Sequence, residues 1–301
     1  MDAMEAFKKQ GIQNLVLDLR DNGGGLMKEA VDITDEFLDG DKLIVYTEGL
    51  HEKKREYRCK RPGIFEKGGL VVLVNERSAS ASEVVSGALQ DWCRAKVIGR
   101  RTFGKGLVQD QYSLSDGSGI RLTIARYYTP LGRSIQRPYA KGKKIYMDEI
   151  MERYNDGELS YADSNKVTKG KAFITTCNDT VYGSGGIMPD VFVGIDTAEY
   201  SQQLNELLTG NALSSYVYHY YLQHKQQMEQ YGSAEDFAQQ FNAAGLWNGF
   251  AAYPAGITAK QKEKVQQRMK ALLARFRWRN AGYYRVLNNN DPLLNIAVQQ
   301  L

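Results

Sequence analysis

The sequence contains few cysteines and histidines, and their spacing is poor for a metal site or a disulfide network. The three cysteines, Cys59, Cys93 and Cys177, are odd in number and widely separated, and no Cys-x-x-Cys pair occurs. Two of the histidines, His219 and His224, stand five residues apart, whereas a spacing of about four would place both on one helix face. We therefore expect neither a disulfide framework nor a metal site, and no cofactor.

Long hydrophobic segments and a strong charge imbalance are also missing. The apolar run Leu70–Val74 is far shorter than the roughly 20 residues that a membrane-spanning helix needs. The 39 basic and 35 acidic residues leave a formal net charge of +4, which is too weak to indicate a nucleic-acid partner. The N-terminal MDAMEAFKKQG lacks the pattern of a signal peptide, so we expect either a cytosolic chain or a piece of a longer one.

The hydrophobic periodicity indicates two regions of different character. Up to residue 130, short apolar runs alternate with helical patterns, which is typical of an α/β fold. Strands are predicted at 15–19, 43–47, 70–75, 96–99, 108–114, 120–128 and 191–195, and helices at 3–9, 28–38 and 80–94. Residues 131–180 are polar and turn-rich, and from Thr197 the sequence is helical and rich in Gln, Ala and Tyr. We place a domain boundary near Asp196, with a core domain over 1–196 and a mainly helical domain over 197–301.

Several common catalytic motifs are incomplete or absent. Gly99–Lys105 reads GxxxxGK, the start of a phosphate-binding loop, but the next residue must be Ser or Thr to hold magnesium and is Gly106. A strand, not the required helix, is predicted to follow. No HExxH, GxSxG or SxxK pattern occurs. These observations argue against a nucleotide site and against serine hydrolases of the α/β-hydrolase or penicillin-binding type.

Three weaker signals remain, and each has an ordinary structural explanation. Ser80 begins a predicted helix, where free N–H groups can stabilise an oxyanion, yet a helix-capping serine is the simpler interpretation. Lys105, between Gly104 and Gly106, can serve as a base for a serine if its amine is uncharged in apolar surroundings. A lysine between glycines is also typical of a solvated turn. The turn Gly23–Gly25 supplies either a further N–H donor or only a chain reversal.

Taken together and in chain order, these signals become specific. They stand in the segments LDLRDNGGG, VLVNERSASASEVVSGALQD and VIGRRTFGKGLVQ, and a later segment reads YGSGGIMPDVFV. This arrangement resembles the carboxy-terminal processing peptidases, the S41 serine peptidases with a Ser-Lys dyad, over residues 12–137. The resemblance implies an α/β core of the type shared by Clp protease and crotonase, followed here by a mainly helical C-terminal region.

The resemblance also implies a role for individual residues. Ser80 is the expected nucleophile, Lys105 the general base, and Gln109 the residue that orients the lysine. The expected oxyanion donors are the N–H groups of Ala81 and Gly24, with Gly23 as the alternative to Gly24.

The implied activity is cleavage of polypeptides near their C-termini through an acyl-enzyme, with protein or peptide substrates as partners. The family carries a PDZ domain, further core strands and an export signal before these motifs. We therefore expect this chain to be the C-terminal portion of a longer enzyme of the cell envelope or periplasm. One alternative stays open, a catalytically silent binding or scaffold fragment. An acyl-CoA enzyme on the crotonase fold has no need of a Ser-Lys pair, so the presence of Ser80 and Lys105 counts against it.

The helical region offers only general signals. Between Lys260 and Arg285 it carries nine basic residues against one acid, Glu263, together with an apolar stripe. A basic amphipathic helix can lie on a membrane surface or bind a partner. A solvated basic face over a packed helical core is the interpretation we favour. A homo-oligomer formed through this region is a further possibility.

Overall fold

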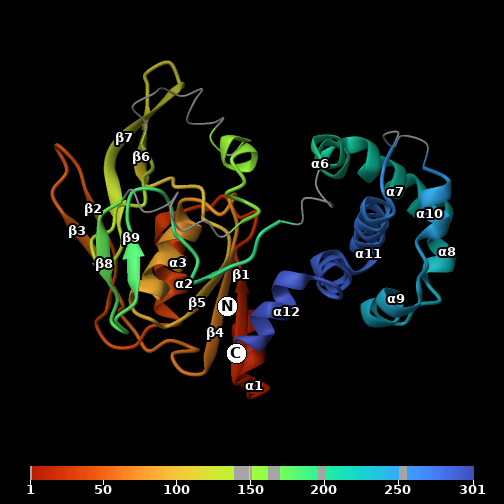
Figure 1. The fold of residues 1–301 in the computed structure, drawn as a ribbon, viewed down its shortest axis with the longest axis horizontal. Coiled ribbons are helices and arrows are strands. Elements are labelled where there is room, and N and C mark those ends of the chain that lie inside the picture. The colour runs from red at the N-terminus through yellow and green to blue at the C-terminus, as the bar shows by residue number, and fades with distance from the viewer. Residues whose placement is uncertain (1, 139–148, 150, 162–169, 196–200, 251–255) are drawn as a thin grey trace. The chain divides into compact units, whose positions relative to one another are not determined.

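The computed structural model describes residues 2–138, 149, 151–161, 170–195, 201–250 and 256–301 (Figure 1). The chain divides into two compact units, which we call the core unit (residues 1–194 and 296–301) and the helical unit (residues 195–295). Asp196, where the change in sequence character suggested a boundary, lies outside the described residues. No sequence pattern predicted that the last six residues belong to the core unit.

A parallel sheet of four strands forms one layer of the core unit. Its strands are β1 (Asn14–Asp18), β4 (Gly69–Val74), β5 (Lys96–Gly99) and β10 (Val191–Phe192), in the order β1-β4-β5-β10. The central strand β4 reads GLVVLV, and its last five residues are buried. A continuous apolar run of this kind is typical of a parallel strand that is covered on both faces.

A second sheet of four strands is antiparallel. Its strands are β3 (Arg55–Arg58), β2 (Leu43–Glu48), β7 (Gly119–Tyr128) and β6 (Leu107–Ser113), in the order β3-β2-β7-β6. The hairpin of β6 and β7 was predicted from the sequence. Strand β3 was not, because REYR is polar and lies exposed at the edge of the sheet.

Helices α2 (Met27–Asp35) and α3 (Ala81–Asp91) pack against each other and against strands of these sheets, and α1 (Asp2–Lys9) precedes β1. Helix α3 contacts both β5 and β2, so it lies between the two sheets (Figure 1). Its residues 82–91 are all buried for this reason, including the polar ones. The α/β architecture followed by a helical region is therefore confirmed.

The segment that the sequence left without regular structure contains a small hairpin. It consists of β8 (Ala172–Ile174) and β9 (Thr180–Tyr182), which pair only with each other among the described strands. Three-residue strands of this length leave little periodicity to detect in a sequence.

The helical unit is built around the long helix α11 (Ala259–Asn288), which contacts several shorter helices. These are α6 (Gln202–Thr209), α7 (Asn211–Gln223), α8 (Lys225–Met228), α9 (Ala234–Gln240) and α10 (Ala244–Asn248), and α12 (Pro292–Gln299) begins in this unit. Three residues of the apolar stripe, Val265, Met269 and Leu273, are fully buried in the core of the unit.

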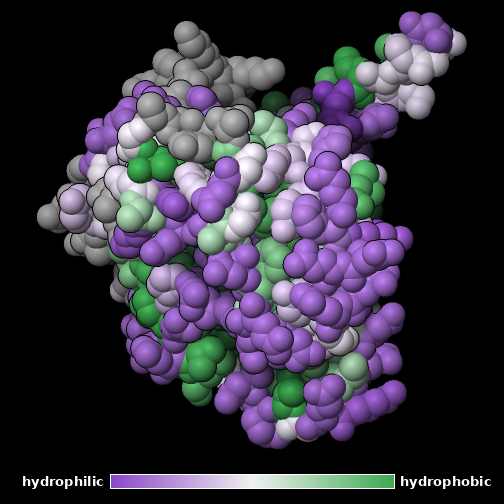
Figure 2. All heavy atoms as spheres, turned by 90° about the vertical axis from the view of Figure 1, so that its right-hand side faces the viewer, coloured by the Kyte–Doolittle hydropathy of each residue, from purple (hydrophilic) through white to green (hydrophobic). Residues whose placement is uncertain are grey.

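The helices and the visible surface bear on contact with a membrane. Among the described residues, no helix is long and apolar enough to cross a bilayer. The face turned to the viewer in Figure 2 is mostly hydrophilic, with hydrophobic side chains only in small separate patches. Contact of the basic helix with a membrane surface, and oligomerisation, stay predictions.

Candidate active site

Ser80 stands at the start of α3, just after the loop that leaves β4. Its backbone has φ 57° and ψ −113°, a conformation that non-glycine residues adopt rarely and at a cost in free energy. The preceding loop is fixed to the end of β1, since the Ser78 hydroxyl donates to the Leu19 carbonyl at 2.7 Å and the Ala79 N–H donates to the Asn22 carbonyl at 3.0 Å. The half-buried Ser80 is therefore held by two neighbouring parallel strands.

The glycine turn after β1 lies directly against this helix start. Gly24 has φ +85°, and a Cβ atom there would come within 2.5 Å of the Ala79 carbonyl oxygen and 2.7 Å of the Ala81 nitrogen. Only glycine fits such a position, whereas a Cβ on Gly23 would meet open space. The structure thus brings Gly24 together with Ser80 and Ala81.

The two expected oxyanion donors differ in their present partners. The Ala81 N–H has no acceptor among the described residues, as a donor awaiting a ligand requires. The Gly24 N–H donates to the Asn22 side-chain oxygen at 2.9 Å. It would have to leave Asn22 in order to serve an oxyanion.

Lys105 lies in the loop between β5 and β6 (residues 100–106), which we call the lysine loop. The carboxylate of Glu83 joins this loop to the start of α3. Glu83 Oε2 accepts the Ser80 N–H at 2.8 Å and the Lys105 N–H at 2.9 Å. Both bonds end on one oxygen, so the two backbone nitrogens cannot be farther apart than the sum of these distances. Glu83 Oε1 accepts the Gly104 N–H at 2.7 Å and the Thr102 hydroxyl at 2.5 Å.

The other side of the lysine loop rests on residues after β7. The Arg137 N–H donates to the Gly104 carbonyl at 3.1 Å, and the Arg137 guanidinium lies 4.1 Å from the centroid of the Phe103 ring. Gln136 accepts the Gly106 N–H at 2.9 Å through its side-chain oxygen. The loop backbone is therefore fixed on both sides.

The side chain of Lys105 is less constrained than its backbone. The residue is exposed, so the apolar surroundings that would keep its amine uncharged are not present in this structure. Its position in the turn before β6 leaves it open to solvent. Among the described residues, its amine makes no hydrogen bond to the Ser80 hydroxyl.

Gln109 lies four residues beyond Lys105 on β6, where it is exposed and pairs with Thr123 just after an irregularity in the strand register. No hydrogen bond joins it to Ser80 or Lys105 among the described residues. The structure therefore brings together Ser80, Ala81 and Gly24 and the backbone of Lys105, and it shows no bond from Gln109 to this group.

Two arginines and a glutamate that the sequence analysis did not single out also hold the backbone of the lysine loop. Arg101 and Arg153 both donate to the Glu158 carboxylate, at 2.7 and 2.9 Å, and Arg153 also donates to the Thr102 carbonyl at 3.1 Å. Burial, reinforced by the neighbouring Arg101 charge, lowers the pKa of Arg153 to about 10. Burial alone would raise the pKa of Glu158, but the hydrogen bond from Arg101 and the two arginine charges outweigh it and lower that pKa.

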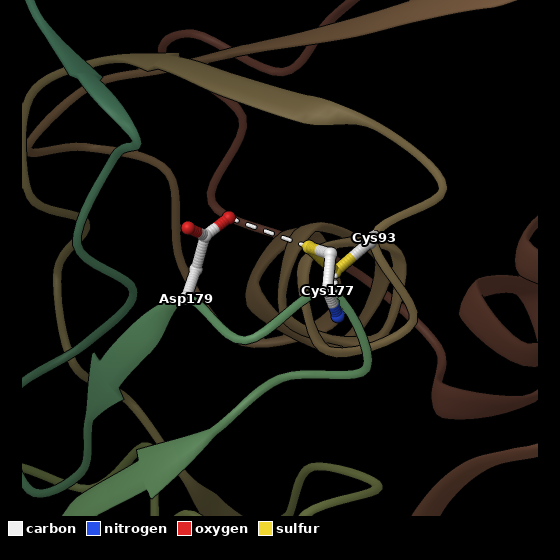
Figure 3. A group of neighbouring side chains, drawn as sticks. All are labelled: Cys93, Cys177 and Asp179. Atoms are coloured by element: carbon white, nitrogen blue, oxygen red, sulfur yellow. Dashed lines mark hydrogen bonds between the residues drawn. A yellow bond between two sulfur atoms is a disulfide. The ribbon is translucent and has the colours of Figure 1, made fainter.

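The expectation of no disulfide is wrong. Cys93, just after α3, is bonded to Cys177, in the turn between β8 and β9, across 84 residues of sequence (Figure 3). Asp179 lies beside this bridge. The two sulfurs bond to each other, so neither offers a metal the thiolate that a ligand requires. Only Cys59 is free, and it is buried.

Glu83 stands three residues after Ser80, which is the spacing of a helix-capping box. That pattern is real, because Glu83 accepts the Ser80 N–H as a capping glutamate does. Its bonds to Thr102, Gly104 and Lys105 depend on tertiary structure and left no signal in the sequence.

Comparison with known proteins bears on both units. Residues 1–143 match peptidase family S41, and residues 203–279 match a family of unknown function. The carboxyl-terminal-processing protease of Synechocystis sp. is 40% identical over 151 residues, which are 50% of this chain and 34% of that protein. The chloroplastic C-terminal processing peptidase of Tetradesmus obliquus is 46% identical over 140 residues, which are 45% and 30% of the two chains.

Among solved structures, the photosystem II D1 C-terminal processing protease matches with a TM-score of 0.44 and 34% identity, over 64% of this chain and 38% of that one. The chain thus spans about a third of the length of these curated relatives. The resemblance to carboxy-terminal processing peptidases, first drawn from the DLRDNGGG, SASASE and FGKG segments, is confirmed by the family match and the two curated relatives. Residues 1–143 of this chain are thus similar to peptidase family S41.

Proposed function

We propose that this chain carries the catalytic site of a serine peptidase that cleaves polypeptides near their C-termini with a Ser80–Lys105 dyad. One observation carries the proposal: the start of α3, the Gly24 turn and the backbone of the Lys105 loop converge, with Glu83 Oε2 accepting from both Ser80 and Lys105. Peptide-bond cleavage by a serine needs a nucleophile, a base and oxyanion donors in one place. Each of these groups is available here.

The proposed reaction proceeds in two acyl-transfer steps. The uncharged Lys105 amine takes the proton from Ser80 as Oγ bonds to the peptide carbonyl carbon. The resulting ammonium gives this proton to the leaving amine as the C–N bond breaks, which leaves an acyl-enzyme on Ser80. Water, deprotonated by the same amine, then attacks the ester and releases Ser80.

The backbone N–H groups at the start of α3 stabilise the negative charge that develops on the carbonyl oxygen. Ala81 offers its N–H directly, and Gly24 offers a second N–H once it leaves Asn22. Loss of one such donor costs other serine enzymes about 2.7–4 kcal/mol of transition-state stabilisation.

The exposed Lys105 side chain must turn toward Ser80 for the reaction. Catalytic hydrogen bonds are often long in free enzymes and tighten when substrate binds. The Lys105 backbone is fixed, so rotation about its side-chain bonds is the movement that the proposal requires. In this account Gln109 orients the amine after that rotation.

The Cys93–Cys177 bridge supports a place for the protein outside the reducing cytosol. Disulfides persist in secreted and periplasmic proteins and are rare in the cytosol of most organisms. We therefore propose the cell envelope or periplasm, or an equivalent oxidising compartment.

The proposal is tested by cleavage of an unfolded protein substrate, with each new C-terminus identified by mass spectrometry. We expect Ser80→Ala to abolish cleavage and Lys105→Ala to lower it by about 10⁴-fold, as when a member of a catalytic set is removed. Ser118→Ala and Lys96→Ala, which change exposed residues elsewhere in the core unit, are matched controls and should cleave normally. Normal activity in Ser80→Ala or Lys105→Ala contradicts the proposal.

A catalytically silent binding module is the second candidate. Two observations favour it: the Lys105 amine and the Ser80 hydroxyl are not bonded, and the Gly24 N–H is held by Asn22. If the wild-type chain binds unfolded polypeptide without cleaving it, and Ser80→Ala binds equally well, this candidate replaces the peptidase.

A further inference from the structure

Glu83 joins three parts of the candidate site through one buried carboxylate. Its side chain has no exposed surface, and its two oxygens accept four hydrogen bonds, from Ser80, Thr102, Gly104 and Lys105. Three of these donors belong to the lysine loop, and the fourth is the backbone of the nucleophile itself. Among the described residues, the two segments are also joined by the bond from the Phe103 N–H to the Ser78 carbonyl and by the Glu76–Arg100 ion pair at 2.7 Å.

The arrangement is unusual for a buried acid. Ionised carboxylates in protein interiors are normally paired with a cation, yet among the described residues no ion pair reaches Glu83. Burial raises the pKa of Glu83, and the hydrogen bonds from Thr102, Lys105, Gly104 and Ser80 act in the opposite direction. The carboxylate is thus held by oriented donors alone, which makes its position depend on the loop and the helix at once.

The bond to Ser80 also falls at a strained position. The Ser80 backbone has φ 57°, and conformations of this kind persist only where the surroundings over-determine them. The Glu83 carboxylate accepts from the N–H of this very residue. A shift of the carboxylate would therefore affect both the nucleophile's backbone and the base's backbone.

We infer that Glu83 is a positioning residue, which fixes the Lys105 loop against the Ser80 turn so that the base can reach the nucleophile. This inference rests on the proposed function. It assigns Glu83 no contact with substrate and no share in proton transfer. Its effect passes through Lys105, and that dependence separates it from a residue that merely stabilises the fold.

The decisive experiment is a double-mutant cycle of Glu83→Gln and Lys105→Ala, read as kcat and KM for one peptide substrate. Glutamine keeps the shape but replaces one acceptor oxygen by a donor that faces N–H groups. We expect Glu83→Gln alone to lower kcat by about 100-fold with KM within about threefold, as for an interaction made in the transition state. In the Lys105→Ala background it should cost less than about threefold, because coupled residues are not additive.

Glu36→Gln is the matched control. Glu36 is buried like Glu83 and accepts the Ile64 N–H at 3.0 Å, and none of its hydrogen bonds among the described residues reaches Ser80 or residues 100–106. We expect its kcat to stay near that of the wild type. Equal losses of kcat from Glu83→Gln in the wild-type and Lys105→Ala backgrounds would show a merely structural role and overturn the inference.

A second variant covers the case in which Glu83→Gln does not fold. Thr102→Val removes one of the four donors to Glu83, and Thr102→Ser keeps it. We expect Thr102→Val to lower kcat by about tenfold and Thr102→Ser to retain most of it, because valine loses both the bond to Glu83 and the bond that the hydroxyl accepts from the Ile187 N–H at 2.7 Å. Equal activity of the two variants contradicts the inference.

Hydrogen exchange separates this inference from the proposed function, because it needs no activity. In the folded wild-type chain the amides of Gly104 and Lys105 should be protected, and Glu83→Gln or Thr102→Val should speed their exchange by tenfold or more. Faster exchange in a chain that never cleaves peptides supports the positioning role and rejects the peptidase. Unchanged exchange in a chain that does cleave rejects the positioning role alone.

Discussion

The two units of this protein differ in how closely their sequences are tied to their structures. In the core unit, short segments that look unremarkable alone, such as NGGG and FGKG, end up around one serine at the start of α3. In the helical unit, the basic and aromatic residues that attract attention mostly pack or cap: the Lys270 amine, for example, donates to the Ala238 and Phe241 carbonyls at 2.7 and 2.6 Å. The comparison teaches that ordered motifs indicate chemistry, whereas composition and periodicity indicate packing.

The sharpest way to test the core side of this comparison is Gly24→Ala. The added Cβ would overlap the Ala79 carbonyl oxygen and the Ala81 nitrogen, and the positive φ disfavours any side chain. We expect peptide cleavage to fall by about 100-fold or more, since both proposed oxyanion donors would move. Gly23→Ala is the control, because its Cβ meets no atom within 4 Å. If Gly24→Ala cleaves as well as Gly23→Ala, the turn has no part in the site.

The disulfide gives the next largest effect. It closes a loop over 84 residues, and removal of a native disulfide typically costs about 2–5 kcal/mol of unfolding free energy. We expect the double variant Cys93→Ala, Cys177→Ala to lose stability in this range in denaturant unfolding. A reductant should destabilise the wild type and leave the double variant unchanged. Equal sensitivity of both to reductant would mean that the bridge does not form.

The independence of the helical unit can be tested with Leu213→Ala. Leu213, on α7, is fully buried, so the cavity should cost about 2–5 kcal/mol. Leu222→Ala on the same helix, where the side chain is 53% exposed, is the control and should cost little. We expect hydrogen exchange to rise in the helical unit only. Faster exchange at Ser80 or Lys105 as well would show that the two units unfold together.

The smallest expected effect is the pH dependence of stability that comes from Glu158, whose arginine partners hold the lysine loop. The pKa of Glu158 is lower in the folded protein than in the unfolded chain, where it is about 4.3. The ionised carboxylate therefore stabilises the folded state above the unfolded pKa. This stabilisation is lost as the pH falls through the folded pKa. We expect Glu158→Gln to lower the free energy of unfolding by on the order of 1 kcal/mol at neutral pH. The free energy of unfolding of this variant should also decrease less as the pH falls. Glu152→Gln, which changes an exposed residue, should leave the decrease of unfolding free energy in acid unchanged. A decrease of unfolding free energy in acid as large in Glu158→Gln as in the wild type would contradict this account.

How far the sequence predicted the structure depends on whether the signal was local. Strand β4 was found because its apolar run is continuous, and α3 because Val84, Val85, Ala88 and Leu89 repeat at helical spacing. The order of the motifs was enough to name Ser80, Ala81 and Gly24, which the structure places together.

The features that the sequence did not reveal depend on partners distant along the chain. Cys93 and Cys177 carry no local sign of pairing, and Glu83 reads as a helix cap until the fold adds Gly104 and Lys105. The exposure of the Lys105 side chain was missed for the same reason, since its apolar neighbours in sequence do not cover it. Burial is set by tertiary contacts, which local residue types indicate only weakly.

The most direct test of the central claim is the rate at which a fluorophosphonate, a serine-directed acyl-transfer probe, labels the chain, with the modified residue identified by mass spectrometry. The account predicts one adduct on Ser80 in the wild type and labelling at least about 100-fold slower in Lys105→Ala, because the base contributes to activating the serine. An adduct on another residue, or equal labelling of Ser80 in both proteins, would contradict it.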